Sequence, residues 1–312
     1  MSNLIYLNPV NDEEKDLIAE YQESISRKAK STVDVYIRII SQFASWLASK
    51  HGEFSPSNFT RTAVDTYLDY LNEKEYSISH QNRVKTTLSG FAKWLIDEKE
   101  LLNKNPTTGL DIPAQSMMAP RQLTDEQRYI LRSLVEKEGT VRGQAIFSLG
   151  YWAGCRVSDV SWLLLKNVNV GRKIGTITVG HKGGKERDLD IINEVRGPLY
   201  DYIHSGDRQK DSPYVFTSQR SERLTEHGIH HWFRNLKAMA TKNEWPEIED
   251  LTFHDLRHDF AHRAREVGWG IEELAFYLGH ITKKGTPAIQ TTVRYTQVGR
   301  EQIKNKLRLL KG

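Results

Sequence analysis

The chain has 312 residues, which is enough for two domains of ordinary size, each with its own hydrophobic core. Hydrophobic residues make up 38% of it, and no apolar run approaches the roughly 18 residues that a membrane-spanning helix needs. The net charge of +4 permits an anionic partner without requiring one, and the single cysteine, Cys155, excludes an intramolecular disulfide. The first residues lack the basic and apolar regions of a secretory signal, so we expect a cytoplasmic protein with no membrane partner.

Three amphipathic helices are predicted in the first third of the chain. The first runs from Thr32 to about His51, the second follows the segment from Ser57 to Thr60, and the third begins at Ser77 or Ser79. Their apolar residues recur at three-to-four spacing: Tyr36, Ile39, Ile40, Phe43, Trp46 and Leu47, then Val64, Tyr67, Leu68 and Leu71, then Val84, Leu88, Phe91 and Leu95. The spacing predicts an all-helical bundle.

Residues 103–122 contain three prolines and little periodicity, which is typical of an extended connection between domains. We place the boundary near residue 116, so that a helical domain of residues 1–116 precedes a second domain of residues 123–312. The second domain is expected to open with a helix whose N-cap is Thr124.

The segment of residues 173–192 alternates apolar and polar residues on both sides of Gly183-Gly184, which predicts a β-hairpin. Lys182 and Lys185 flank the tip of this hairpin. Helical periodicity returns at residues 231–240, 254–266 and 271–280. The chain is therefore predicted to be mainly α, with a helical first domain and a mixed α+β second domain that contains a small antiparallel sheet.

Six residues in the second half have side chains suited to phosphoryl transfer. In chain order they are Arg156, Lys182, His254, Arg257, His280 and Tyr295. Two guanidinium groups can bind the nonbridging oxygens of one phosphodiester, lysine and histidine can move protons, and a tyrosine hydroxyl can attack phosphorus. Together these residue types indicate metal-free phosphoryl transfer on a nucleic acid.

Each of these residues also has a simpler interpretation. Arg156 resembles a surface arginine capped by Asp159 at a strained turn or a helix start. His254 and Arg257 are three apart in a predicted helix and so share a face, but His254 and His258 also imitate an H-E-x-x-H zinc motif. Asp255 is shorter than the usual glutamate and Arg257 would repel a dication, so we expect no metal.

The C-terminal candidates are ambiguous in the same way. His280 follows a glycine that ends an apolar helix, where a histidine also interacts with the helix C-terminus. Tyr295 is one of thirteen tyrosines, most of which must serve packing. Only the combination of residues distinguishes them.

The segments GCRVSDV, HKGGKER, FHDLRHDFA, LGH and TTVRYTQV resemble the signature segments of the tyrosine recombinase (integrase) family, in the family's order. The resemblance runs from about Leu123 to Tyr295, and the helical region before it is similar to the family's SAM-like core-binding domain. It implies an enzyme that cuts and rejoins DNA strands at specific sites, through a 3′-phosphotyrosyl intermediate and a Holliday junction, with no metal, ATP or other cofactor.

By position, the resemblance implies a role for each candidate: Arg156 and Arg257 bind phosphate, Lys182 is the general acid, His254 and His280 occupy the two histidine positions, Asp159 supports the site and Tyr295 is the nucleophile. Lys185 is the alternative acid, because both lysines flank the same turn. The segment between His280 and Tyr295 is longer than is usual in the family, so the delivery of the tyrosine is an open question.

The resemblance also implies a C-shaped clamp around double-stranded DNA, with the helical domain on one face of the duplex and the catalytic domain on the other. The expected DNA partner carries an inverted-repeat site and is bound by a tetramer in the synapse, with a monomer as the alternative state in solution. Arg83, Lys85 and Lys185 are the candidate DNA-contacting residues, and the protein is expected on the nucleoid when bound to DNA. A basic C-terminal helix, residues 300–312, packs on its own domain or on a neighbouring protomer. The alternative functions are a type IB topoisomerase and a DNA-binding regulator without catalysis.

Overall fold

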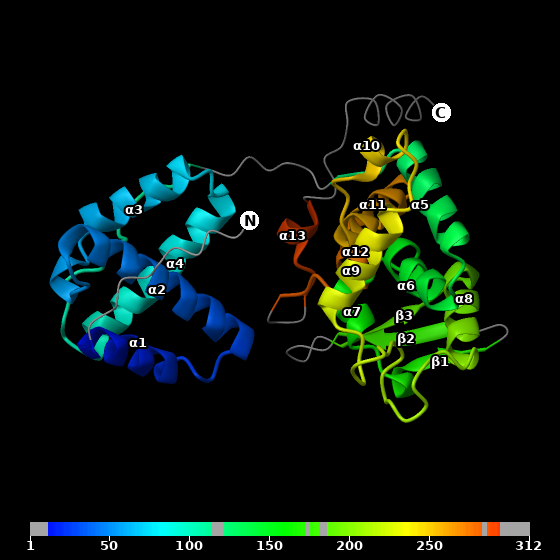
Figure 1. The fold of residues 1–312 in the computed structure, drawn as a ribbon, viewed down its shortest axis with the longest axis horizontal. Helices are drawn as coiled ribbons and strands as arrows, with labels where there is room; N and C mark the ends of the chain where they lie inside the picture. Colours follow the sequence, from blue (N-terminus) through cyan, green and yellow to red (C-terminus); the bar gives the residue numbers. More distant parts are fainter. Residues whose placement is uncertain (1–11, 114–120, 172–174, 181–185, 283–285, 294–312) are drawn as a thin grey trace. The chain divides into compact units, whose positions relative to one another are not determined.

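The computed structural model describes residues 12–113, 121–171, 175–180, 186–282 and 286–293 (Figure 1). Contacts between Cα atoms divide the chain into two compact units, Met1–Ser116 and Met117–Gly312. Within the described ranges, no helix has both the length and the apolar character that crossing a membrane requires. The predicted contacts of Lys182, Lys185, Tyr295 and the C-terminal segment lie outside these ranges.

In its described residues, 12–113, the first unit is a bundle of four helices. They are α1 (Asp12–Ser24), α2 (Lys30–His51), α3 (Arg61–Glu73) and α4 (Ile78–Asp97), with a short 3-10 turn at Pro56–Asn58. The three helices predicted here are confirmed. The Thr60 hydroxyl accepts a hydrogen bond from the N–H of Ala63, and the Ser77 hydroxyl accepts one from the N–H of His80. Side-chain caps therefore mark the N-termini of α3 and α4.

Helix α1 was not predicted, because its sequence offers only a weak apolar stripe. Ile18 and Tyr21 are nevertheless buried, and the Tyr21 ring meets the Phe91 ring edge to face with centroids 5.1 Å apart. Aromatic residues from α2 and α4 complete the centre of the bundle, where Phe43 and Phe91 have no exposed surface. Burying large rings of this kind supplies much of the stability of a small helical unit.

The second unit combines nine helices with a small sheet in the part of the chain that the structure describes. The longer helices are α5 (Asp125–Glu138), α6 (Val141–Tyr151), α8 (Asn193–His204), α9 (Glu226–Lys237) and α11 (Phe253–Glu266). The shorter ones are α7 (Val157–Ser161), α10 (Trp245–Ile248), α12 (Ile271–Tyr277) and α13 (Ile289–Val293), and a 3-10 turn spans Leu165–Asn167. The predicted cap is confirmed, since Thr124 and Gln127 form a reciprocal capping box.

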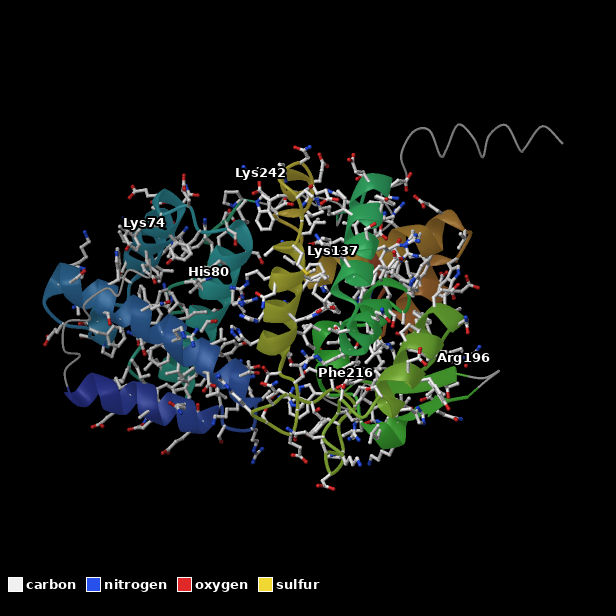
Figure 2. The ribbon with its side chains drawn as sticks, turned by 45° about the vertical axis from the view of Figure 1, so that its right-hand side comes forward. Lys74, His80, Lys137, Arg196, Phe216 and Lys242 are labelled. Atoms are coloured by element: carbon white, nitrogen blue, oxygen red, sulfur yellow. The ribbon has the colours of Figure 1, made fainter. Side chains whose placement is uncertain are left out.

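The sheet has the order β1 (Val168–Val170), β2 (Gly175–Val179), β3 (Arg187–Asp190), and both pairings are antiparallel. The predicted hairpin strands are confirmed, with Ile177 opposite Leu189, but the three-residue strand β1 is too short to give a recognisable alternation. Phe216 lies inside this unit and stacks on Tyr202 at 5.2 Å (Figure 2). Ile177, Val179 and Leu189 belong to the same buried cluster, so the core supports one face of the hairpin.

Candidate active site

The first element of the site is the turn between α6 and α7, which presents Arg156. Gly154 adopts a left-handed conformation (φ 60°), and a Cβ there would lie 2.6 Å from the Phe260 ring, so only glycine fits. Arg156 then caps α7, with its backbone N–H donating to Asp159 at 3.0 Å. Of the two interpretations of this segment, a strained turn or a helix start, the helix start is confirmed, and so is the contact with Asp159. The Arg156 side chain is half-buried beside it.

Arg257 links this turn to two other segments of the sequence. Its guanidinium is fully buried and donates to the carbonyl oxygens of Gly154 and Leu278, each at 2.6 Å, and its Nη2 lies 3.2 Å from Nε2 of His280. One arginine of α11 thus holds the Gly154–Arg156 turn and the Leu278–His280 turn together. Arg257 is a fixed cation at the centre of the site.

His280 is held in a neutral form by the same surroundings. Burial and the nearby charges of Arg257, Arg156 and Arg187 lower the pKa of His280 to about 3. Because Arg257 can only donate, Nε2 is the acceptor of that contact, and the ring proton is on Nδ1, which lies 3.0 Å from Oγ1 of Thr292. The histidine therefore connects the buried arginine to α13.

The segment between His280 and Tyr295 folds back on itself in its described part. Ile281 and Pro287 form an isolated antiparallel bridge, and the Ala288 N–H donates to the His280 carbonyl at 2.6 Å. These contacts bring the chain back to His280 before α13 begins. Tyr295 comes two residues after the end of α13 and lies outside the described residues.

His254 lies on α11 one turn from Arg257 but in a different environment. His254 is exposed, whereas Arg257 has no exposed surface, so the shared face predicted from their spacing spans the boundary between core and surface. Limited hydration around the ring and the charge of Arg257 lower the pKa of His254, which favours the neutral, proton-accepting form at pH 7.

The arrangement of α11 bears on the zinc alternative. His254 and His258 are close, with ring centroids 4.3 Å apart. Asp255, however, accepts the backbone N–H and the hydroxyl of Thr252, both at 2.7 Å, as the N-terminal cap of α11. Among the described residues, no three of the His, Cys, Asp and Glu side chains cluster as metal ligands. Asp255 serves the helix, so the H-E-x-x-H likeness lacks its carboxylate.

The prediction omitted Arg187, which connects the hairpin to the rest of the site. Its Nη2 lies 3.0 Å from Oδ2 of Asp159 and its Nε donates to the Tyr277 carbonyl at 2.8 Å. A Cβ on Gly279, which has φ 66°, would come within 3.0 Å of the Arg187 side chain. Strand alternation gives a signal for it, because Arg187 shares the inward face of β3 with Leu189.

Lys237 was also omitted, although it fixes the loop before α11. Its buried ammonium donates to the carbonyl oxygens of Ile248, Glu249 and Leu251 at 3.1, 2.7 and 2.7 Å. Burial lowers the pKa of Lys237, but all three donors are satisfied. In the sequence, Lys237 lies beside the apolar stripe of α9, and this position indicates that its ammonium has a hydrogen-bond partner inside the unit.

The basic residues proposed for the first unit differ in their surroundings. Arg83 is exposed on α4, while the ammonium of Lys85 donates to the Leu110 carbonyl near the end of the unit. Lys182 and Lys185 belong to the segment that joins β2 to β3 and lie outside the described residues. The structure thus brings Arg156, Asp159, Arg257 and His280 together, with His254 at the margin.

The buried histidines lead to a prediction for acid stability. An unfolded chain protonates histidine near pH 6.5, whereas the folded pKa is about 3 for His280 and about 4 for His258. Between these values the unfolded state binds more protons, so the free energy of unfolding of this unit should fall as the pH falls from 6.5 toward 3. Urea denaturation at several pH values would measure the slope.

His280→Asn should flatten that slope, because it removes one of the histidines with a lowered pKa and keeps a donor near Thr292. His227→Asn, at an exposed position on α9, is the control and should leave the slope unchanged. A slope that is the same in wild-type protein and in His280→Asn would contradict the lowered pKa.

Comparison with known proteins agrees with this architecture. The family model described as "Phage integrase family" matches residues 121–302, and the model of the phage integrase N-terminal SAM-like domain matches residues 17–100. The tyrosine recombinase XerC of Herpetosiphon aurantiacus is 29% identical over 280 residues, which cover 87% of this chain and 86% of the relative. The TnP I resolvase of Bacillus thuringiensis is 26% identical, covering 91% of this chain and 95% of the relative.

Solved structures show the same fold. The Tn1549 transposon integrase in complex with transposon right end DNA aligns with a TM-score of 0.71 at 18% identity, covering 95% of this chain and 99% of the other. The XerH site-specific recombinase bound to its palindromic difH substrate aligns with a TM-score of 0.73 at 14% identity, covering 95% and 84%. The integrase model spans more than half of the sequence and includes all six candidate residues, so the chain belongs to the phage integrase family of tyrosine recombinases.

Proposed function

We propose that this tyrosine recombinase cuts and rejoins double-stranded DNA at specific sites through a 3′-phosphotyrosyl intermediate. The contact set of Arg257 is the observation that carries the proposal, because it joins the turn of Arg156 to the turn of His280. Arg187 adds a third guanidinium to this cluster, and all three lower the pKa of His280. A concentration of positive charge around a neutral histidine suits a phosphodiester.

The arginines would stabilise the charge that develops during attack on phosphorus. Arg156 is half-buried at the start of α7, so we propose that its guanidinium binds a nonbridging oxygen directly. Arg257 is enclosed, so its contact with phosphate requires neighbouring groups to move when DNA binds. Donors that are already fixed in place lower the barrier more than mobile ones do, because they need little reorganisation during the reaction.

The proton transfers follow from the same assignment. The Tyr295 oxygen attacks phosphorus, its proton passes to neutral His254, and the bond to the 5′ oxygen breaks as the Lys182 ammonium donates a proton to that oxygen. A 5′ hydroxyl from another strand then reverses the step and releases the tyrosine. The energy of the broken bond is kept in the phosphotyrosyl link, so ATP is not needed.

We also propose the DNA contacts and the assembly. Arg83 is exposed and available to a phosphate, whereas Lys85 would have to exchange the Leu110 carbonyl for one. Lys185 would contact DNA beside Lys182. An inverted-repeat site, two protomers on each site and four in the synapse are the arrangement that we expect, and light scattering of the DNA complex would measure the stoichiometry.

A covalent adduct tests the function. A binding site is first selected by the protein from random-sequence duplexes, and a nicked version that loses a short fragment on cleavage traps the adduct. We expect a protein–DNA adduct in wild-type protein with EDTA present, at the rate seen without it, because arginines and not a bound cation neutralise the phosphate. Loss of cleavage in EDTA that zinc restores would support the metal alternative at His254 and His258.

The two other functions give different results. Absence of any adduct on the selected site would favour a DNA-binding regulator without catalysis. Relaxation of supercoiled plasmids that lack the selected site would favour a type IB topoisomerase. We expect an adduct on the selected site and no relaxation without it.

A further inference from the structure

Thr292 has a buried hydroxyl near the C-terminal end of α13, three residues before Tyr295. Its side chain has no exposed surface. The hydroxyl oxygen lies 3.0 Å from Nδ1 of His280 and 3.3 Å from the carbonyl oxygen of Ala288. A hydroxyl can accept one hydrogen bond and donate another, so both contacts can be formed together.

The donors and acceptors around His280 form a chain with one direction. Nη2 of Arg257 donates to Nε2 of His280, the Nδ1–H of His280 donates to Thr292, and the Thr292 hydroxyl donates to the Ala288 carbonyl. This order requires a neutral histidine, and burial together with three arginines keeps it neutral. The chain connects the enclosed cation of the site to α13.

The backbone adds a second attachment at the same place. The Ala288 N–H donates to the His280 carbonyl at 2.6 Å, one residue before α13 begins. Helix α13 has only five residues, too few to be stable without tertiary contacts. Its orientation therefore depends on tertiary contacts, which are its packing against α12 and the two attachments to His280, one through the backbone and one through the Thr292 hydroxyl.

We propose that Thr292 is a positioning residue for the nucleophile, acting through its hydrogen bond to His280. The proposal rests on the assignment of Tyr295 under the proposed function. Through this bond, the residue that holds α13 is also the residue that contacts Arg257, so the helix before Tyr295 is placed relative to the phosphate-binding cluster. The bond adds a side-chain attachment to the backbone bond between Ala288 and His280.

The matched variants are Thr292→Val, which keeps the shape of the side chain and removes the hydroxyl, and Thr292→Ser, which keeps the hydroxyl. Adduct formation is measured in single turnover on the nicked duplex at saturating protein, and DNA affinity by fluorescence anisotropy. We expect Thr292→Val to cleave about 10-fold to 100-fold more slowly, since a small displacement of a reacting group has effects of this size. Affinity should change less than about twofold, and Thr292→Ser should recover most of the rate.

Thr286→Val is the control, because it removes a hydroxyl bonded to exposed Thr282 in the same connection, away from His280. It should cleave like wild-type protein. Wild-type cleavage by Thr292→Val, or equal loss in Thr292→Val and Thr292→Ser, would overturn the inference. Tyr295→Phe distinguishes a failure of the nucleophile assignment from a failure of the role of Thr292. An adduct in Tyr295→Phe contradicts the nucleophile assignment. No adduct in Tyr295→Phe, together with full activity of Thr292→Val, contradicts only the role of Thr292.

Discussion

Tyr295→Phe is expected to abolish formation of the covalent adduct while DNA binding is retained. The change removes one oxygen, the atom that would attack phosphorus, and leaves the ring and every basic residue in place. Removal of a nucleophile typically lowers the rate on the order of 10⁴-fold or more. Cleavage of the nicked duplex is followed on a denaturing gel, and affinity is measured by anisotropy on the uncleaved site.

Tyr277→Phe provides the matched control, because Tyr277 is the tyrosine whose carbonyl contacts Arg187 in the same cluster. Burial raises the pKa of Tyr277, which makes its phenolate harder to form, so this variant should still give an adduct. Mass spectrometry of the wild-type adduct should place the nucleotide on the peptide that contains Tyr295. An adduct in Tyr295→Phe, or its loss in Tyr277→Phe, would move the nucleophile elsewhere.

The parts of the fold that the sequence predicts well are those with a local physical signal. Thr124 was recognisable as a cap, and the helix starts near Thr60 and Ser77 as boundaries, because a capping hydrogen bond joins residues only three apart. Helix α1 gave less signal, because Tyr21 becomes buried only when Phe91, 70 positions later in the sequence, is placed against it. Strand β1 was missed for the same reason, since its pairing with β2 is a tertiary contact.

The site shows the same division between local and distant contacts. The cap of α7 by Asp159 could be predicted from spacing, and the family resemblance supplied the order of the candidate residues. Arg187 meets the Tyr277 carbonyl 90 positions later in the chain, and Lys237 meets carbonyls at the end of α10 and just after it. Sequence periodicity does not identify such distant partners. A charged residue on an inward face indicates only that it has a hydrogen-bond partner.

The direction of Arg257 could not be predicted from helix geometry. Positions three apart on a helix differ by about 60° around the axis, so they share a face only in part. Gly154 packs closely against Phe260, which places the Gly154 carbonyl inside the unit. Arg257 donates to this carbonyl and is therefore buried, while His254 is exposed. The predicted common ligand of these two residues stays a prediction.

Lys182→Ala is expected to slow cleavage of ordinary DNA by about 10²-fold to 10⁴-fold, the usual contribution of a general acid. Without the ammonium, the 5′ oxygen must leave as an alkoxide, a poor leaving group at neutral pH. Replacing that bridging oxygen with sulfur removes the requirement, because a thiolate leaves without a proton. The variant should therefore recover much of its rate on the sulfur-substituted duplex, measured in single turnover beside the unmodified one.

Two further variants decide whether this rescue identifies the acid. Arg156→Ala should stay slow on both substrates, because it loses stabilisation of the nonbridging oxygens and the leaving group does not change that loss. Lys185→Ala should cleave both duplexes alike, since the alternative lysine of the same turn would then contribute only to binding. Equal rescue of Lys182→Ala and Arg156→Ala would show that sulfur accelerates the reaction without regard to the acid. Rescue confined to Lys185→Ala would assign the proton to the other lysine, and the hairpin that Arg187 anchors to Asp159 would then present Lys185 to the 5′ oxygen.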